Sequence, residues 1–200
     1  IIPVYNVAKY IERFLLSVLN QTWQDLEVIL VNDCTPDGSM QIVKKLISSH
    51  PRGAVVRCLE HEKNRGLSAA RNTGISVSVG DYLYFLDSDD YIPANAIELL
   101  AEAARQKQTN FVIGNYEVTG ARRWAPPLSL GTGLYEGNAL VLSNYVQEKW
   151  YVMAWNKLVS RPFVLQHQLY FQEGIVHEDD LWSFKLACMA QSMYVVDETT

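Results

Sequence analysis

Three short stretches of this sequence place carboxylates where the chain is expected to turn. Residues 87–90 read DSDD and directly follow the apolar run of residues 82–86. Carboxylates this close repel one another unless a cation or several hydrogen-bond donors lie among them. Mg²⁺ and Mn²⁺ prefer oxygen ligands and share them with substrate phosphates, so this stretch suits a divalent metal on a diphosphate. The alternative is acidic capping of a helix that begins at Pro93, which explains Asp90 well but Asp87 poorly.

The second acidic position, Asp33, follows residues 27–31, whose composition predicts a buried strand. Its carboxylate could accept hydrogen bonds from an N–H of a nucleotide base or from a ribose hydroxyl. The alternative is local turn chemistry, because Asn and Asp commonly bond their own backbone in turns. Both interpretations stay open from this residue alone.

The third acidic stretch is HEDD at residues 177–180, followed by Leu181, Phe184 and Cys188 at helical spacing. Acidic residues in a first helical turn interact favourably with the helix dipole, so a structural role is sufficient to explain them. His177 could instead be a metal ligand, although an isolated histidine usually is not.

The elements expected to position these residues alternate along the first half of the chain. Apolar runs predict strands at residues 1–4, 27–31, 55–59 and 81–86, separated by helices near residues 7–19, 40–47, 66–77 and 93–104. We expect Asn6 to cap the first helix. This alternation predicts an α/β fold with a mainly parallel central sheet and helices on both faces. Ligands bind beyond the carboxyl ends of such strands, where the acidic residues are expected.

The second half is less regular. Residues 120–133 are rich in Gly and Pro and predict a long loop, and helices are expected at residues 138–147 and 178–190. Trp124, Trp150, Tyr151 and Trp155 could stack on sugar rings or could equally form core.

Composition excludes several classes of protein. The 200 residues fit one domain, and a net charge of −5 gives no basic field for nucleic acid. The apolar runs are too short to span a membrane. Three scattered cysteines favour a reducing compartment over a disulfide scaffold. Because the sequence opens within an expected strand, we expect a piece of a longer protein.

Taken together, these stretches resemble the family 2 glycosyltransferases of the GT-A (nucleotide-diphospho-sugar transferase) fold. The resemblance runs through most of the chain, in order: PVYN (3–6), SVLNQT (17–22), VNDCTPDGS (31–39), NRGLSAARNTG (64–74), FLDSDD (85–90), WNKL (155–158) and HEDD (177–180). One departure is residues 34–36, where the family more usually shows Gly-Ser-Thr. Asp33 and Asp37 are retained, and Pro36 stiffens the turn.

The resemblance implies a role for each matching residue. Asp33 would bind the nucleotide base, most simply uracil, in a pocket that Pro3, Tyr5 and Arg71 also line. Asp87, with Ser88 beside it, would meet the ribose or the sugar. Asp89 would bind Mn²⁺ or Mg²⁺, with Asp87 as a second candidate ligand. Asp179 would be the general base, with Glu178 and Asp180 as alternates.

The reaction that this resemblance implies is sugar transfer with inversion from a nucleotide-diphosphate sugar, most simply a UDP-sugar. The acceptor would be a hydroxyl of a glycan or a lipid-linked molecule, in polysaccharide or cell-surface glycan synthesis. Residues 1–118 would form the nucleotide-sugar-binding half, and residues 119–200 the acceptor-side half that carries the base. We expect a cytoplasmic enzyme able to work at the inner face of the membrane. The sequence does not predict an oligomeric state.

Two rival functions stay open. A nucleotidyltransferase that makes nucleotide sugars uses a similar sheet, but it usually carries a Gly-rich phosphate loop that residues 5–8 lack. A module that binds nucleotide sugar or glycan without turnover is the other rival, because fold does not fix function.

Overall fold

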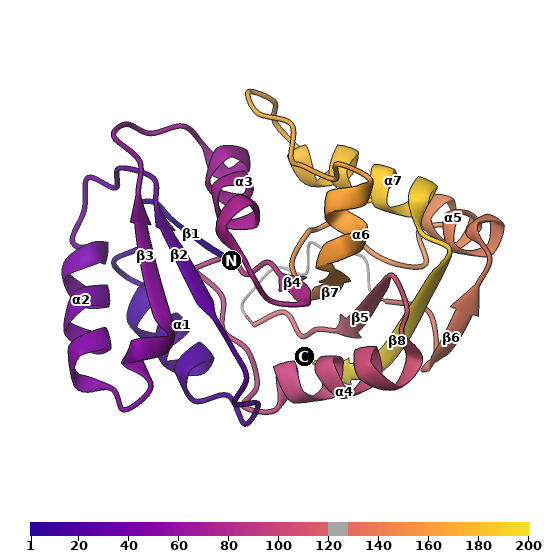
Figure 1. The fold of residues 1–200 in the computed structure, drawn as a ribbon, viewed down its shortest axis with the longest axis horizontal. Helices are drawn as coiled ribbons and strands as arrows, with labels where there is room; N and C mark the ends of the chain where they lie inside the picture. The colour runs from indigo at the N-terminus through magenta and orange to yellow at the C-terminus, as the bar shows by residue number, and fades with distance from the viewer. Residues whose placement is uncertain (120–127) are drawn as a thin grey trace.

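The structure, a computed structural model, describes residues 1–119 and 128–200 and contains two sheets (Figure 1). The first sheet is parallel and has the order β1-β2-β3. Its strands and the helices that connect them are β1 (Ile2–Val4), α1 (Ile11–Leu19), β2 (Val28–Asn32), α2 (Ser39–Ser49), β3 (Val56–Glu60) and α3 (Leu67–Val77), with a short 3₁₀ helix at Gly53–Val55. This half follows the predicted alternation of strands and helices.

The second sheet is mixed and has the order β4-β7-β5-β8-β6. Only β5 and β8 pair in parallel, and the other neighbours are antiparallel. Its elements are β4 (Tyr82–Tyr84), α4 (Ala96–Lys107), β5 (Phe111–Asn115), β6 (Gly133–Glu136), α5 (Asn138–Val146), β7 (Lys157–Ser160), α6 (Arg161–Gln166), α7 (Glu178–Met189) and β8 (Ser192–Thr199). Strands β4 and β5, which precede residue 118, therefore belong to the second sheet.

The two sheets are joined where β1 meets β4. The Ile1 amino group donates to the Tyr84 carbonyl at 2.8 Å, and the Leu86 N–H donates to the Ile1 carbonyl at 3.1 Å. Helices cover the second sheet on both faces, with α4 on one side and α6 and α7 on the other (Figure 1). The predicted α/β fold with helices on both faces is thus confirmed, and none of the described helices is long and apolar enough to cross a membrane.

Two helices begin later than the sequence predicted. Helix α1 starts at Ile11 rather than after Asn6, because the N–H groups of Asn6 and Ala8 donate instead to Thr35 and Asp37. Helix α4 starts at Ala96 rather than at Pro93. There the Gln21 side chain donates to the Pro93 carbonyl and accepts from the Ile97 N–H, so it serves as the cap.

The aromatic residues of the second half lie mainly in its core. Trp150 and Tyr151 are fully buried, and Trp155 packs partly buried against the same cluster. For Trp150 and Tyr151 the core interpretation is therefore confirmed. Trp124 and most of the predicted loop lie outside the described residues.

Candidate active site

Asp33 lies at the carboxyl end of β2 and is 2% exposed. One carboxylate oxygen accepts from the Arg65 N–H at 2.9 Å and contacts His61 Nδ1 at 2.6 Å. The other accepts from the Gly66 N–H at 2.7 Å. A carboxylate offers about four acceptor positions, so one remains for a ligand N–H or hydroxyl. Asp33 thus binds the loop before α3 to the end of β2, and one acceptor position of its carboxylate is left for a ligand.

Local turn chemistry at this strand end belongs to other residues. The Asn32 side chain accepts from the Thr35 N–H at 2.9 Å, and Asp37 accepts from Ser39 and from the Ala8 N–H. Partial burial alone would raise the pKa of Asp37, but the hydrogen bonds from Ser39, Ala8 and Thr35 lower it to about 2. The turn interpretation of Asp33 is therefore wrong, because its partners lie more than 25 residues away.

The neighbouring strand end brings Tyr5 to the same edge. Val4 pairs with Asn32, and the Asp33 N–H donates to the Val4 carbonyl at 3.0 Å. Pro3 is buried in β1, whereas the Tyr5 side chain is 48% exposed just beyond it. An exposed ring beside a buried carboxylate is an arrangement that a nucleotide base can use for stacking and hydrogen bonding.

Arg71 forms the centre of a second polar group, which we call the arginine cluster: Arg71, Asp87, Glu178 and Asp179. Arg71 projects from α3 and is 1% exposed. It donates to Asp87 at 2.9 Å, to Glu178 at 3.0 Å and to Asp179 at 2.5 Å. The cluster therefore joins the end of β4 to the first turn of α7, which lie about 90 residues apart in the chain. Asp180 is exposed and does not share these hydrogen bonds.

The charges of the arginine cluster do not balance. Burial alone would lower the pKa of Arg71, but the nearby charges of Asp87 and Asp179 raise it, so the guanidinium stays protonated. Desolvation raises the pKa of Asp87 despite the opposing effect of Arg71, and Asp179 raises it further. One cation thus faces three carboxylates, and the cluster carries an excess of negative charge when all three are ionised.

Asp89 and Asp90 add to this excess in the exposed turn after Asp87. Desolvation together with the charges of Asp89 and Asp87 raises the pKa of Asp90 to about 6. Because α4 begins six residues after Asp90 and has Glu98 as its first-turn acid, the helix-capping interpretation of these residues is wrong. Ser88, which follows Asp87 in the chain, is buried.

A divalent metal fits this turn if substrate phosphates complete its ligands. Among the described residues, no group of three or more His, Cys, Asp or Glu side chains is arranged to hold a metal by itself. Mg²⁺ commonly uses only one or two carboxylates together with phosphate oxygens and water. Asp89 is exposed and can supply such a ligand, whereas one oxygen of Asp87 already accepts from Arg71. His177 is exposed at the start of α7.

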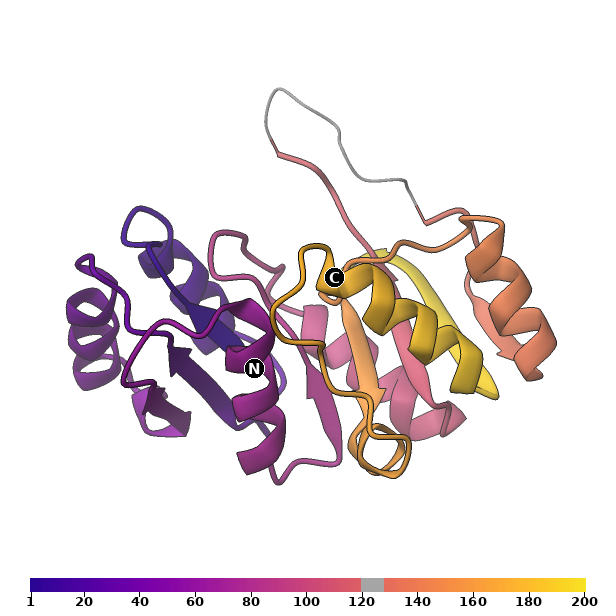
Figure 2. The same ribbon diagram turned by 90° about the horizontal axis from the view of Figure 1, so that it is seen from above.

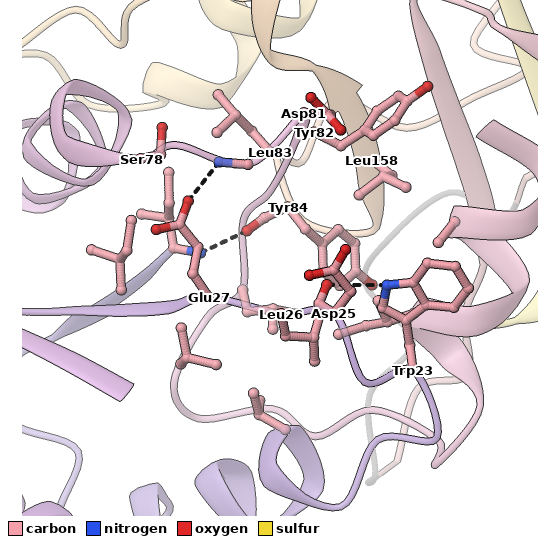
Figure 3. Close-up of a pocket in the computed structure, with 18 of the residues that line it drawn as sticks. Trp23, Asp25, Leu26, Glu27, Ser78, Asp81, Tyr82, Leu83, Tyr84 and Leu158 are labelled. Carbon is pink, nitrogen blue, oxygen red and sulfur yellow. Dashed lines mark hydrogen bonds between the residues drawn. The ribbon is translucent and has the colours of Figure 1, made fainter. Parts of the chain in front are cut away.

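Two pockets lie near these strands, and they differ in their relation to the acidic residues. A pocket of about 540 Å³ is lined by Asp87, Asp89, Asp90 and several aromatic side chains, Trp155 among them. A pocket of about 680 Å³ lies at the amino ends of the strands and is lined by Glu27, Tyr82 and Tyr84 (Figure 3). Since ligands in open α/β sheets bind at the carboxyl ends, the acidic pocket is the candidate site.

Sequence reasoning missed the residues that support the acidic ones. His61 and Arg65 hold Asp33, and Phe171 lies under the Arg71 guanidinium at 4.9 Å. Lys157, in β7, is fully buried. His61 lies in a turn-like stretch without periodicity, so only the pairing of β2 with β3 brings it to Asp33. The WNKL match at residues 155–158 was the one signal that marked Lys157.

The parallel sheet followed by a mixed sheet, with carboxylates at the strand ends, is the arrangement of the GT-A class, and solved structures agree. S. aureus TarS residues 1–349 in complex with UDP matches with a TM-score of 0.85 and 23% identity, covering 100% of this chain and 57% of that chain. The mannosyltransferase PcManGT from Pyrobaculum calidifontis, in complex with GDP-Man and Mn²⁺, matches with a TM-score of 0.71 and 17% identity, covering 98% of this chain and 53% of that chain.

The sequence itself gives the family. The model of the family described as Glycosyl transferase family 2 matches residues 1–161, so the chain belongs to that family. The uncharacterized glycosyltransferase EpsJ of Bacillus subtilis is 35% identical over 99% of this chain and 58% of its own length. The glycosyltransferase GlyA of Streptococcus pneumoniae is 31% identical over 100% of this chain and 29% of its own length. The chain therefore spans less than two thirds of these relatives.

Proposed function

We propose that this chain is the catalytic domain of an inverting, metal-dependent glycosyltransferase that moves a sugar from a UDP-sugar to a hydroxyl of a glycan or lipid-linked acceptor. The observation that carries the proposal is the arginine cluster, which places the carboxylates of α7 beside the carboxyl end of β4. A donor-side carboxylate and a candidate base thus lie around one guanidinium. Family membership supports the same reaction class.

The donor would be held by the strand ends of both sheets. Asp33 accepts from the base, Tyr5 and Pro3 flank it, and Arg71 holds Asp87 in place beside Ser88 for the ribose or the sugar. The structure of TarS in complex with UDP-GlcNAc matches 100% of this chain, which supports a uridine nucleotide as the donor's nucleotide. Asp89 would hold Mn²⁺ or Mg²⁺, with Asp87 as a second ligand. The metal supplies Lewis-acid stabilisation of the departing diphosphate.

Asp179 is the candidate for the base. A general base must lie within hydrogen-bond reach of the proton that it removes. Arg71 occupies one oxygen of Asp179, which leaves the other oxygen for an acceptor hydroxyl. The acceptor oxygen bonds to the anomeric carbon as the bond from that carbon to the diphosphate breaks, and the proton passes to Asp179. Glu178 shares the contact with Arg71 and is the first alternate, whereas Asp180 is exposed and is the second alternate.

The place of action follows from the same proposal. A lipid-linked acceptor would bring the enzyme to the inner face of the membrane, and a soluble glycan would not. A role in polysaccharide or cell-surface glycan synthesis is part of this proposal, and EpsJ and GlyA, both named glycosyltransferases, support its reaction class.

Product analysis tests the proposal against its rivals. The protein is incubated with a panel of UDP-sugars, Mn²⁺ and candidate acceptors, and the released phosphates are identified. Transfer releases UDP and elongates the acceptor. A parallel incubation with UTP and a sugar 1-phosphate tests the first rival, because release of pyrophosphate there would identify a nucleotidyltransferase. Tight binding of a UDP-sugar without turnover would identify a binding module.

A further inference from the structure

The segment before α7 is fastened to α3 by a reciprocal pair of hydrogen bonds. The Asn72 side-chain amide donates to the Phe171 carbonyl at 2.8 Å and accepts from the Phe171 N–H at 2.8 Å. Asn72 directly follows Arg71 on the same helix. Figure 2 shows the chain that leads into α7 passing beside α3. The amide thus exchanges two hydrogen bonds with one residue, as paired residues of neighbouring strands do, and it fixes the backbone of Phe171.

The ring of Phe171 contacts both Arg71 and Trp182 of α7. Phe171 is 2% exposed, and the Arg71 guanidinium lies 4.9 Å from its ring centre. Trp182 of α7 stacks on the same ring at 4.9 Å with 6° between the planes. Phe85, two residues before Asp87, meets both rings edge-on at 5.1 and 5.5 Å. A single packed group therefore spans the end of β4, α3 and α7.

This packing matters because the guanidinium has few other restraints. The Nε atom of Arg71 is buried and has no hydrogen-bond partner among the described residues. The guanidinium is held by the three carboxylates and by the face of Phe171. A stacked guanidinium keeps a defined plane, and that plane sets where its carboxylate partners lie.

We propose that Asn72 is a positioning residue for the base: it fixes Phe171, Phe171 supports Arg71, and Arg71 holds Asp179. The inference rests on the proposed function, in which Asp179 takes the proton of the acceptor. A displacement of about 1 Å in a catalytic group can cost on the order of 100-fold in rate. Asn72→Ala should therefore lower kcat by about 10- to 100-fold, while the KM for the UDP-sugar, to which Arg71 contributes through Asp87, should rise by a smaller factor.

A matched control exists at the other end of α7. Asn138 is also partly buried, and its amide donates to the carbonyls of Ala187, Cys188 and Ala190. Asn138→Ala removes these three hydrogen bonds at the C-terminal end of α7, whereas Arg71 contacts the first turn of the helix. The substitution should lower stability without the selective loss of kcat. Equal effects of Asn72→Ala and Asn138→Ala on kcat would mean a merely structural role and would overturn the inference.

A double-mutant cycle tests the route itself. The hydrogen bonds of Asn72 are to the backbone of Phe171, so Phe171→Leu keeps them and removes the ring that packs on Arg71, Trp182 and Phe85. If Asn72 acts through that ring, Asn72→Ala should cost little further kcat in the Phe171→Leu background. Additive losses would contradict the route. Should Phe171→Leu fail to fold, Phe171→Met fills the site with a flexible side chain and replaces it.

The same assay separates this inference from the proposed function. If the wild type does not release UDP from any UDP-sugar, or Asp179→Asn releases it at the wild-type rate, the proposed function or its base assignment fails. If the wild type is active, Asp179→Asn is inactive and Asn72→Ala resembles Asn138→Ala, only the positioning role fails.

Discussion

The two polar centres of this domain are built in opposite ways. Asp33 is one carboxylate held by donors from three residues, two of them backbone N–H groups. Arg71 is one guanidinium that holds three carboxylates. The first centre is nearly satisfied by its own chain, and its remaining acceptor position suits a neutral donor. The second carries excess negative charge, to which Asp89 and Asp90 add.

This difference indicates what each centre can bind. A buried, hydrogen-bonded carboxylate with one free position can recognise the N–H of a base without a change in structure. The arginine cluster has three carboxylates and only Arg71 as a cation, so a second cation is needed to reduce its repulsion of a diphosphate. In the proposed function, the parallel sheet would therefore recognise the nucleotide base, and the junction with the mixed sheet would bind the metal and the diphosphate.

The largest expected effect separates the two centres in kinetics. Asp179→Asn should lower kcat by about two to four powers of ten, because the acceptor hydroxyl loses its general base. Donor affinity should stay near that of the wild type, since Asp33 is untouched. Steady-state kinetics with UDP binding measured in parallel checks both values. Asp180→Asn is the matched control, and full activity of Asp179→Asn would transfer the base role to Glu178 or Asp180.

The second-largest expected effect concerns how much the arginine cluster contributes to stability. Arg71→Met should lower the free energy of unfolding by about 3 kcal/mol, because it leaves three carboxylates without their buried partner. Urea denaturation at pH 7 measures this change. Arg105→Met, at an exposed position on α4, should change little. A loss of stability in Arg71→Met no larger than that in Arg105→Met would show that solvent replaces the guanidinium as the partner of the three carboxylates.

A smaller loss of stability is expected when Asp33, the first centre, is changed. In Asp33→Asn the amide can present an N–H toward the N–H of Gly66 or of Arg65, so the loop before α3 loses an acceptor. The cost of such an unsatisfied buried donor is about 1–3 kcal/mol. Urea denaturation against Asp81→Asn, an exposed control, measures it. A neutral result would mean that His61 and the loop do not depend on this carboxylate.

The smallest effect concerns a third buried charge, Lys157. Its Nζ donates to the Met153 carbonyl and lies 4.3 Å from the Tyr151 ring centre. Desolvation lowers the pKa of Lys157 from 10.5 to about 7, although the charge of Asp179 opposes the shift. Between these values the unfolded chain binds more protons, so stability should rise with pH, by at most about 1.4 kcal/mol per pH unit.

Below pH 7 both states of Lys157 are protonated, and this contribution should stay constant. Thermal unfolding of the wild type and of Lys157→Met from pH 7 to pH 9 gives the difference in slope. Parallel curves would mean that Lys157 keeps its proton in the folded protein throughout this range.

The sequence predicted the first half of the fold well because its strands and helices are local. Residues 28–31 form an apolar run, and α1 buries one face at helical spacing. The starts of α1 and α4 were misplaced because their N-terminal contacts come from distant side chains, those of Asp37 and Gln21. No local pattern encodes such partners.

In the candidate site, too, local sequence predicted the acidic residues but not the distant contacts that bring them together. Asp33, Asp87, Asp89 and Asp179 stood out because each follows a strand or opens a helix. The way Arg71 gathers Asp87 with α7, and the way Phe171 lies beneath it, depend on the pairing of β4 with β7 and on the packing of α7. Those contacts join segments about 100 residues apart, which periodicity cannot relate.

The most direct test of the account is a calorimetric titration of UDP into the wild type and Asp89→Ala, each with and without Mn²⁺. Mn²⁺ should increase the affinity of the wild type for UDP by about tenfold or more, a coupling within the usual range. In Asp89→Ala the affinity without metal should persist, because Asp33 still holds the base, while the increase with metal should be lost. Equal UDP affinity with and without Mn²⁺ in the wild type would contradict the claim that the acidic junction recruits a metal for the diphosphate.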